Sequence, residues 1–354
     1  MFLMNGFARI GQGGGHIGNK TKIEHLRAVR YAIECGLTLI DTAEGYNFGI
    51  SEEWIGEAVY GMRNRIFIST KVSPENLSYN NILQSVENSL RRLKTDYIDL
   101  YSVHWPNQKY GAEEIASAFI KLREQGKIIN IGVCNYSLDR VKEFQKYVPN
   151  IFAIQNEYNL VDRSVEDDLL PYCQSNSKHL ISYSPLDQGK LMQDGVLQKI
   201  AIKYNKTVAQ IALSWLITKK NVVPIPESYS PRHIKENSEA VQISLSKEDI
   251  EFIEARSPIP MYIPVNSIRI VSDGRDNRNV YTTIDEAIQN SLNHVPSPLD
   301  LSNEIKKEIS VKPIKVRKSK DPQYQYDLIS GRVRYWAWVI AFKDKPIKAV
   351  ILEE

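Results

Sequence analysis

The first 258 residues of the chain alternate between two hydrophobic patterns. Short runs rich in β-branched residues recur about every 30 residues, and the segments between them repeat their apolar positions with a helical period. Eight of these runs are predicted strands, and they cover Ala8–Gln12, Leu37–Asp41, Ile66–Lys71, Ile98–His104, Ile128–Cys134, Ile151–Gln155, His179–Tyr183 and Val222–Pro226.

The segments between the runs are predicted helices, of which Ile23–Glu34 and Ile82–Leu93 are clear examples with one apolar face each. Strands that alternate with helices on this period indicate an α/β protein with a parallel sheet. Eight such units close a (β/α)8 TIM barrel, although the pattern alone also allows an open doubly wound sheet. The run Gly11–Gly15 lacks the GxGxxG spacing of a dinucleotide fingerprint, so we interpret it as a flexible loop at a strand end.

The pattern changes near residue 257. A Ser246–Asp249 capping box starts a last helix of the first region, and Ser257–Pro260 then cannot continue that helix. We therefore expect a barrel over residues 1–256, a linker over 257–261 and a small α+β domain over 262–354. Its predicted elements are strands at Ile263–Val271, Ile314–Arg317, Tyr326–Ile329 and Ile347–Leu352 and helices at Ile284–Asn293, Leu301–Ile309 and Val333–Phe342.

Composition narrows the functional class. The chain is 42% hydrophobic and 25% charged, which is typical of a globular protein. A net charge of +3 argues against a nucleic-acid partner. Neither a signal peptide nor an apolar run long enough for a bilayer is present, and Cys35, Cys134 and Cys173 show no metal spacing. We expect a cytoplasmic protein without a metal site or a membrane partner.

Four residues with complementary chemistry stand at or just after the ends of three successive predicted strands. They are Asp41, Tyr46, Lys71 and His104. In a TIM barrel the carboxyl ends of the strands build the active site, so these side chains are expected at one mouth. The lysine cation would lower the pKa of the tyrosine from its usual value near 10, the aspartate would hold the lysine, and the histidine would orient a substrate oxygen.

Each of these residues alone also has a structural interpretation, as a turn cap, a surface charge or a packing residue. The four together at these positions favour catalysis. The segments GLTLIDTAEGY, ISTK, DYIDLYSVHWP, LREQGKIINIGVCNYS, IQNEYN, SYSPL and PIPESYSPRHIKENSEA resemble the aldo-keto reductase family, in order, over about residues 7–256. The resemblance implies hydride transfer from NADPH or NADH, with Tyr46 as general acid and Asp41, Lys71 and His104 completing a catalytic tetrad.

The same resemblance implies a binding site for the cofactor. Asn135 and Gln155 would bind the nicotinamide carboxamide, and Tyr183 would stack on the nicotinamide ring. Ser184 and Leu186 would line the pyrophosphate. The residues implied at the adenosine end are Ser228, Glu236 and Asn237.

Two departures from the family pattern affect the cofactor. Cys134 stands where many members have serine, which would weaken one carboxamide contact. Glu227 and His233 stand where NADPH-preferring members carry Lys or Arg. A carboxylate about 4 Å from a 2′-phosphate would cost around 4 kcal/mol per unit charge at an effective dielectric near 20. We therefore expect NADH to be used at least as well as NADPH, with Arg232 as a cation that would counteract this preference.

The C-terminal region resembles the ParB/sulfiredoxin-like fold over about residues 262–354. The feature that carries this resemblance is Gly331-Arg332-Val333-Arg334 between a strand and a helix, preceded by Pro313-Ile314-Lys315-Val316. A G-x-x-R at a helix start offers backbone N–H groups and a guanidinium to phosphate, so Gly331 and Arg334 are the candidate phosphate site. Arg332 and Val333 replace the sulfiredoxin cysteine motif, and no helix-turn-helix follows as in ParB proteins.

Two interpretations of this domain remain open. It either binds a nucleotide, with Asp273 or Asp276 as candidate acids, or it is a module for dimerisation or for covering the barrel. For the whole chain we expect a reductase of a small carbonyl compound, with Trp105, Asn107 and Gly49–Trp54 as pocket candidates. The alternatives are a regulatory sensor of cofactor or nucleotide and a DNA-associated protein. Homo-oligomers are compatible with all of them.

Overall fold

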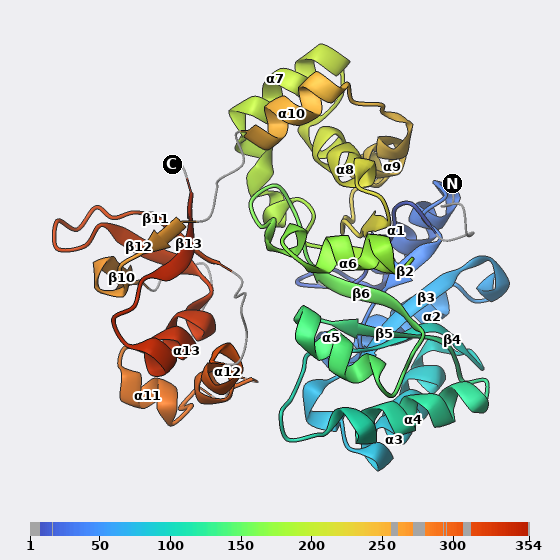
Figure 1. The fold of residues 1–354 in the computed structure, drawn as a ribbon. Coiled ribbons are helices and arrows are strands. Elements are labelled where there is room, and N and C mark those ends of the chain that lie inside the picture. The colour runs from blue at the N-terminus through green and yellow to red at the C-terminus, as the bar shows by residue number, and fades with distance from the viewer. Residues whose placement is uncertain are drawn as a thin grey trace. The chain divides into compact units, whose positions relative to one another are not determined.

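The computed structural model describes residues 8–15, 17–255, 261–271, 280–292, 294, 296–306 and 313–352. The chain folds into two compact units, Met1–Arg256 and Ser257–Glu354 (Figure 1). Residues 256–260, which include most of the predicted linker, lie outside the described residues. The same is true of the candidate acids Asp273 and Asp276.

An eight-stranded parallel sheet forms the centre of the first unit, and its strands follow one another in chain order. The sheet curls until its edges meet, because the N–H groups of Gly11 and Gly13 donate to the carbonyls of Pro224 and Pro226, both at 3.0 Å. This architecture fits the expected (β/α)8 barrel. The strands are β1 (Gln12–Gly13), β2 (Leu39–Asp41), β3 (Phe67–Val72), β4 (Ile98–Val103), β5 (Ile128–Cys134), β6 (Ile151–Glu157), β7 (His179–Tyr183) and β8 (Val222–Pro224).

The helices of this unit follow the predicted alternation. Helix α1 begins at a capping box in which Thr21 and Glu24 bond each other's backbone N–H groups. Helix α3 begins at the Ser78 cap and buries one apolar face. The helices are α1 (Lys22–Glu34), α2 (Ile50–Ala58), α3 (Tyr79–Leu93), α4 (Ala112–Glu124), α5 (Leu138–Gln145), α6 (Leu169–Ser175), α7 (Gly195–Tyr204), α8 (Val208–Thr218), α9 (Pro231–Glu239) and α10 (Lys247–Ala255).

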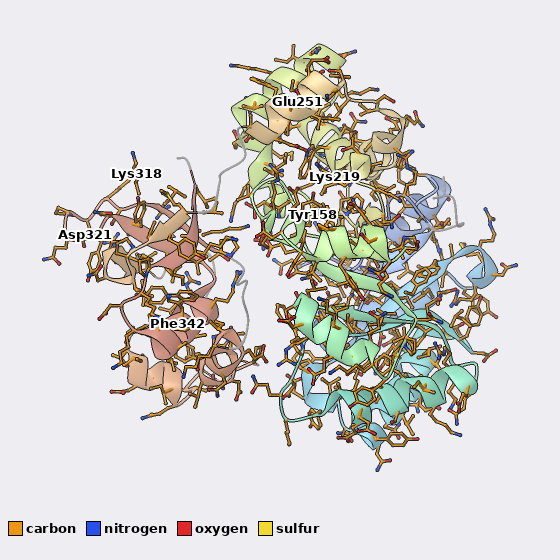
Figure 2. The ribbon with its side chains drawn as sticks, viewed as in Figure 1. Tyr158, Lys219, Glu251, Lys318, Asp321 and Phe342 are labelled. Carbon is orange, nitrogen blue, oxygen red and sulfur yellow. The ribbon has the colours of Figure 1, made fainter. Side chains whose placement is uncertain are left out.

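The main core of this unit lies between the sheet and its helices, and Figure 2 labels one of its members, Tyr158. Tyr158 is fully buried there and meets the ring of Trp215 edge-on, with the ring centroids 5.6 Å apart. A smaller cluster formed mainly from the strands includes Leu39, Leu100 and Ile181. Because both sides of the strands are covered by apolar contacts, the sheet supports a rigid set of strand ends.

Four predicted strands are shorter than expected, among them β2, which begins at Leu39 instead of Leu37, and β4, which ends at Val103 instead of His104. The first strand of the barrel begins at Gln12 instead of Ala8, and the last ends at Pro224 instead of Pro226. Prolines 224 and 226 have no N–H group to donate to a neighbouring strand, which limits regular pairing at this edge. The N–H of Ile225 nevertheless donates to the carbonyl of Ser182 at 3.0 Å, so the chain continues along β7 beyond the regular strand.

The second unit contains a five-stranded mixed sheet with the order β10-β12-β11-β13-β9. The prediction of one strand over Ile263–Val271 is wrong. The segment forms β9 (Met261–Ile263) and β10 (Ile268–Ile270), which lie at opposite edges of the sheet. Pro264 and a 3₁₀ turn over Val265–Ser267 separate them, and Ser267 Oγ donates to the Pro264 carbonyl at 2.6 Å.

The rest of this sheet agrees closely with the prediction. Its core includes the buried side chains of Tyr281, Tyr335 and Trp336. Arg269 donates from Nε to Asp327 at 2.8 Å and from Nη1 to Asp321 at 3.1 Å. The other elements are α11 (Ile284–Ile288), α12 (Pro298–Ile305), β11 (Ile314–Lys318), β12 (Tyr326–Ser330), α13 (Arg332–Phe342) and β13 (Ile347–Leu352).

The helices α11 and α12 end earlier than predicted, and residues 307–312 lie outside the described part of the chain. All three cysteines are free thiols. Within the described ranges, no helix is both long and apolar enough to cross a membrane.

Candidate active site

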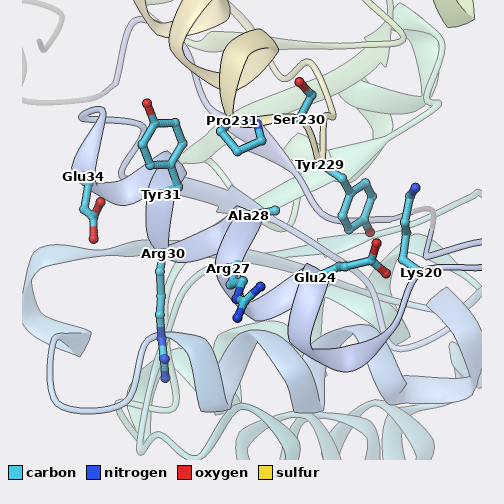
Figure 3. A pocket seen from close by; sticks show the side chains of 10 residues that line it. All are labelled: Lys20, Glu24, Arg27, Ala28, Arg30, Tyr31, Glu34, Tyr229, Ser230 and Pro231. Atoms are coloured by element: carbon cyan, nitrogen blue, oxygen red, sulfur yellow. The ribbon is translucent and has the colours of Figure 1, made fainter.

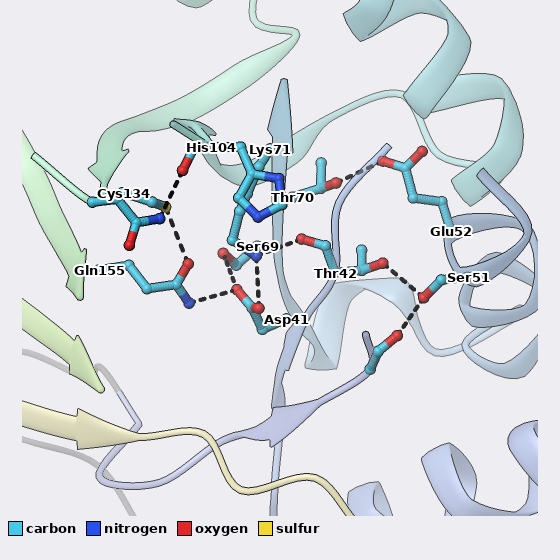
Figure 4. A network of polar contacts seen from close by, with 12 residues as sticks. Asp41, Thr42, Ser51, Glu52, Ser69, Thr70, Lys71, His104, Cys134 and Gln155 are labelled. Atoms are coloured by element: carbon cyan, nitrogen blue, oxygen red, sulfur yellow. Dashed lines mark hydrogen bonds and ion pairs between the residues drawn. The ribbon is translucent and has the colours of Figure 1, made fainter. Parts of the chain in front are cut away.

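The four predicted catalytic residues come together at the carboxyl ends of the barrel strands. Figure 4 shows three of them, Asp41, Lys71 and His104. Asp41 is the last residue of β2, Lys71 lies in β3 and His104 follows β4. Tyr46 begins the 3₁₀ turn η1 (Tyr46–Gly49), five residues after Asp41. The parallel strand order therefore brings residues from three separate segments to one place.

A buried ion pair forms the base of this cluster. Lys71 Nζ lies 2.7 Å from Asp41 Oδ2 and donates to the Thr42 carbonyl at 2.6 Å. Ser69 Oγ and Gln155 Nε2 donate to Asp41 Oδ1 at 2.9 Å and 3.0 Å. Burial is the largest single influence and lowers the pKa of Lys71, but the acidic groups around it, Asp41 foremost, together outweigh burial and hold that pKa above its usual value. Lys71 is therefore a permanent cation, although it is almost fully buried.

Tyr46 lies over this cation. Lys71 Nζ is 5.3 Å from the centroid of its ring, and the ring of His104 meets it edge-on at 5.4 Å. Burial raises the pKa of Tyr46 and Lys71 lowers it, and the net result is a pKa above the usual value. The expectation that the lysine brings this pKa below 10 is therefore wrong for the protein without bound ligand, because desolvation of the phenolate is the larger effect.

The raised pKa keeps Tyr46 protonated at neutral pH, which is the state that a proton donor needs. His104 is neutral as well, since burial and then the nearby Lys71 lower its pKa to about 3. A neutral imidazole retains one N–H group that can donate to a substrate oxygen. The arrangement thus presents two neutral hydrogen-bond donors above one buried cation.

A second group of predicted residues lies beside the tetrad. Asn135 follows β5 with a left-handed φ of 60°. Its Nδ2 donates to the His104 carbonyl at 2.9 Å, and its Oδ1 accepts from the Tyr183 hydroxyl at 2.8 Å. Gln155 is joined to Asp41 through Nε2, and its Oε1 accepts from the thiol of Cys134 at 3.1 Å.

This donor set fits the nicotinamide end of a cofactor. Two carboxamide side chains and the flat ring of Tyr183 surround one place, and each amide keeps one N–H and one lone pair for a further partner. Burial raises the pKa of the Cys134 thiol to about 12, so the thiol stays neutral and donates a weak hydrogen bond. Cys134 thus contacts Gln155, and the weaker ligand contact expected from its replacement of serine stays a prediction.

The predicted pyrophosphate residues follow β7. Ser184 has a left-handed φ of 48°, and its carbonyl accepts from Nδ2 of the buried Asn159 at 3.0 Å. Leu186 packs its side chain against the hydrophobic core. Only the backbone of Leu186 thus remains for the predicted phosphate contact.

The predicted adenosine-end residues lie between β8 and the end of α9. Glu227 is exposed, and Ser228 Oγ accepts a hydrogen bond from the N–H group two residues later at 3.2 Å. Glu236 Oε1 lies 3.0 Å from Arg232 Nε, so the cation that was expected to counteract NADH use has a carboxylate partner. Asn237 is buried in α9.

Three glycines connect the two ends of the site. A Cβ atom on Gly13 would lie 3.3 Å from Cβ of Glu227, and one on Gly15 would lie 2.9 Å from Cε2 of Tyr46. Between them, the N–H of Gly14 donates to the Asp41 carbonyl at 2.8 Å. The interpretation of this run as a loose loop is therefore wrong, since the chain packs closely against both ends of the site.

Residues 3–257 match the model of the aldo/keto reductase family. The chain belongs to this family. Methylglyoxal reductase YeaE of Escherichia coli (strain K12) is 36% identical over 263 residues, which are 71% of this chain and 91% of that protein. An NADH-specific methylglyoxal reductase of the same strain is 30% identical over 270 residues, with 62% of this chain and 82% of that protein covered.

A solved structure is also similar. The aldo-keto reductase from Klebsiella pneumoniae in complex with NADPH has a TM-score of 0.68 and 34% identity, and the match covers 72% of this chain and 94% of that chain. Together with the family match, these relatives show that this aldo/keto reductase is an NAD(P)H-dependent oxidoreductase.

Several residues of this reductase site have no distinctive sequence motif. Glu52 of α2 is fully buried, accepts from Thr70 Oγ1 at 2.6 Å and pairs with Arg92 Nη2 at 2.6 Å. This network supports the strand residue next to Lys71. Phe48, two residues after Tyr46, is fully exposed with a left-handed φ of 56°. A bulky residue in this conformation is rare, and only the structure shows it.

The second unit places its predicted phosphate residues together. Gly331 has a φ of 90° and caps α13, where a Cβ atom would lie 3.3 Å from Arg334 Nη2. Among the described residues, none accepts a hydrogen bond from Arg334 Nη1, which is buried. The family match ends at residue 257, so the ParB/sulfiredoxin-like identity of this unit stays a prediction. No group of three metal-ligating side chains occurs among the described residues.

Proposed function

We propose that this reductase converts small aldehydes and ketones, including 2-oxoaldehydes and sugar-type carbonyls, into alcohols with Tyr46 as the proton donor. The observation that carries the proposal is the neutral Tyr46 held between the buried cation of Lys71 and the neutral His104. The names of two relatives, both methylglyoxal reductases, support a compact carbonyl substrate.

Each residue of the tetrad has its own role in the proposed reduction. A bound nicotinamide supplies the hydride that the carbonyl carbon gains. Tyr46 gives its phenolic proton to the carbonyl oxygen, which becomes the hydroxyl of the product. His104 donates a hydrogen bond to the same oxygen and orients it. Lys71 stabilises the phenolate that is left, and Asp41 keeps Lys71 in place until Tyr46 takes a proton from water.

Other residues would hold the cofactor. Asn135 and Gln155 have amide groups for the nicotinamide carboxamide, and Tyr183 has a ring that can stack on the pyridine. Ser184 and the backbone of Leu186 would meet the pyrophosphate. The residues proposed for the adenosine end are Ser228, Glu236 and Asn237.

Oxidation of NADH and NADPH in the presence of methylglyoxal, other aldehydes, ketones and sugars tests this function. With the wild-type chain we expect the absorbance at 340 nm to fall when a carbonyl compound is added. With Tyr46→Phe this carbonyl-dependent fall should disappear. Tight binding of cofactor without turnover of any carbonyl would instead favour the alternative, a sensor of cofactor state.

We also propose that the chain uses NADH at least as well as NADPH. The exposed carboxylate of Glu227 can accept hydrogen bonds from free ribose hydroxyls, whereas it would repel a 2′-phosphate. The pairing of Arg232 with Glu236 reduces the opposing effect of Arg232. Comparison of kcat/KM for the two cofactors tests this preference. A preference for NADPH above about tenfold, equivalent to 1.4 kcal/mol, would exclude it.

For the second unit we propose binding of a nucleotide phosphate at Gly331 and Arg334. The buried Nη1 of Arg334, without a partner among the described residues, favours this role over a purely structural module. Calorimetric titration of the full chain with ATP, ADP or CTP, with the barrel saturated by NAD⁺ and NADP⁺, should show binding that Arg334→Ala abolishes. Lys343→Ala at the other end of α13 is the control. No binding, or equal binding by Arg334→Ala, would contradict the proposal.

A further inference from the structure

The loop after β8 is tied to helix α1 through a buried histidine. His25 Nδ1 lies 3.0 Å from the hydroxyl of Tyr229, two residues after Glu227. His25 is 1% exposed, and its ring meets the ring of Trp54 edge-on at 5.5 Å. Tyr229 lies at one end of a surface groove of about 630 Å³, close to Lys20 and Glu24 (Figure 3).

The protons of this contact can be assigned by counting donors. Tyr229 also forms a hydrogen bond with Glu227, whose carboxylate can only accept. Tyr229 therefore donates its single hydrogen bond to Glu227 and must accept a hydrogen bond from His25. Burial lowers the pKa of His25 to about 4, so at neutral pH its ring carries one N–H, and that N–H is at Nδ1.

The second ring nitrogen is consistent with this assignment. His25 Nε2 is buried and has no hydrogen-bond partner among the described residues. In the assigned tautomer Nε2 carries a lone pair instead of a proton, and an unmade acceptor is tolerated more readily than a buried unpaired N–H. The two hydrogen bonds therefore point in one direction: His25 donates to Tyr229, and Tyr229 donates to Glu227.

Glu227 is close enough to the catalytic residues for the hydrogen bonds from His25 through Tyr229 to Glu227 to affect cofactor binding. Its Cβ lies beside Gly13 at the barrel mouth, and its charge contributes to the raised pKa of Tyr46. A carboxylate that accepts a hydrogen bond from a polarised hydroxyl is held in one orientation more firmly than an exposed carboxylate without such a bond. An oriented carboxylate discriminates between ligands better than a mobile one, because less side-chain entropy is lost on binding.

We propose that His25 and Tyr229 are positioning residues that hold the Glu227 carboxylate against the adenosine ribose, so that it accepts from free hydroxyls and repels a 2′-phosphate. This inference rests on the proposed function, because it assumes that the ribose lies beside Glu227. It extends the cofactor site to two residues to which the family resemblance assigns no role, although Tyr229 lies within the segment PIPESYSPRHIKENSEA.

The nearby cation of Lys20 should make a change in the discrimination between NADH and NADPH measurable. Lys20 Nζ lies 5.8 Å from the centroid of the Tyr229 ring, and Lys20 attracts a phosphate. When the tyrosine hydroxyl is removed, Glu227 loses its anchor, whereas Lys20 keeps its charge and its aromatic contact. Relaxed discrimination should therefore appear as a gain for the phosphorylated ligand as well as a loss for the unphosphorylated one.

The central test is Tyr229→Phe, which keeps the ring and deletes the hydroxyl. We expect the ratio of kcat/KM for NADH to that for NADPH to fall about 3- to 10-fold, through KM and not kcat, since one charge-assisted hydrogen bond is lost at a partly exposed site. Calorimetry with ADP-ribose and 2′-phospho-ADP-ribose should show the same change in relative affinity without any turnover.

Matched variants separate positioning from general damage. Tyr31→Phe removes a hydroxyl from the same groove, but Tyr31 is not bonded to Glu227, and the ratio should stay unchanged. His25→Leu should change the ratio in the same direction as Tyr229→Phe. His25→Asn can place an amide N–H where Nδ1 lies, and it should restore most of the wild-type ratio.

The outcomes are distinguishable. An unchanged ratio and unchanged relative affinity in Tyr229→Phe, with the wild type active, would overturn the inference and leave the proposed function intact. An equal change in Tyr31→Phe would also overturn it. Absence of carbonyl reduction in the wild type would count against the proposed function, while the ADP-ribose affinities would still decide the role of Tyr229.

Discussion

Replacement of Lys71 by Met isolates the electrostatic part of the proposed mechanism. Lys71 Nζ lies 5.3 Å from the centroid of the Tyr46 ring. At an effective dielectric near 20, a unit charge at this distance stabilises a developing phenolate by about 3 kcal/mol. We therefore expect kcat for carbonyl reduction to fall on the order of 10²-fold, because each 1.4 kcal/mol corresponds to a factor of ten.

The pH profile of the reverse reaction gives the assay. Alcohol oxidation needs the phenolate of Tyr46, so its rate rises as the pH approaches the pKa of Tyr46. Among the described residues, Lys71 is the cation that lowers this pKa, and Lys71→Met removes it. The rise in rate should therefore move to higher pH in Lys71→Met. An unchanged pH profile, or a kcat within threefold of the wild type, would refute this reasoning.

Stability must be controlled in this experiment. Lys71→Met leaves the carboxylate of Asp41 buried without its cation, and breaking a buried ion pair in this way typically costs about 3–5 kcal/mol. The double variant Asp41→Asn/Lys71→Met removes both charges and should recover most of that loss. The Asp41 charge raises the pKa of Tyr46, so the double variant should shift the pH profile less than Lys71→Met does. If the double variant folds like the wild type and its profile still moves to higher pH, the effect belongs to the cation.

Four further predictions concern residues around the tetrad. Glu52→Ala should lower the free energy of unfolding by about 3 kcal/mol in urea titrations, because Arg92 loses its buried partner. Burial raises the pKa of Glu52, so the wild type should lose some stability as the pH rises past the usual carboxyl range, and Glu52→Gln should remove that slope. Phe48→Gly should raise the unfolding free energy by up to about 1 kcal/mol by relieving its left-handed φ of 56°, and a loss would contradict this. Gly15→Ala should reduce kcat at least about tenfold by displacing Tyr46, the proposed proton donor, whereas Gly111→Ala, with open space around its Cβ, should not.

The position of the tetrad could be predicted because barrel topology determines it. Asp41, Lys71 and His104 stand at the ends of strands that the hydrophobic pattern marks clearly, and parallel strands must present those ends together. The strands β5 and β7 have the predicted bounds for the same reason. These are local patterns repeated along the chain.

Other features depend on contacts between distant segments. The net direction of the Tyr46 pKa follows from how deeply its hydroxyl is buried, which the presence of Lys71 in the sequence does not reveal. The bond between His25 and Tyr229 joins residues 204 positions apart. The predicted strand at Ile263–Val271 is split at Pro264, because a proline cannot donate to a strand pair. This split could therefore be predicted from the sequence.

Single-turnover oxidation of enzyme-bound NADH or NADPH by saturating methylglyoxal, compared between the wild type and Tyr46→Phe, tests the central claim most directly. If Tyr46 donates the proton, the rate constant in the variant falls at least about 10²-fold while cofactor affinity stays unchanged, as expected for loss of a positioned acid. A variant that retains more than about 1% of the wild-type rate constant would mean that another group protonates the carbonyl oxygen.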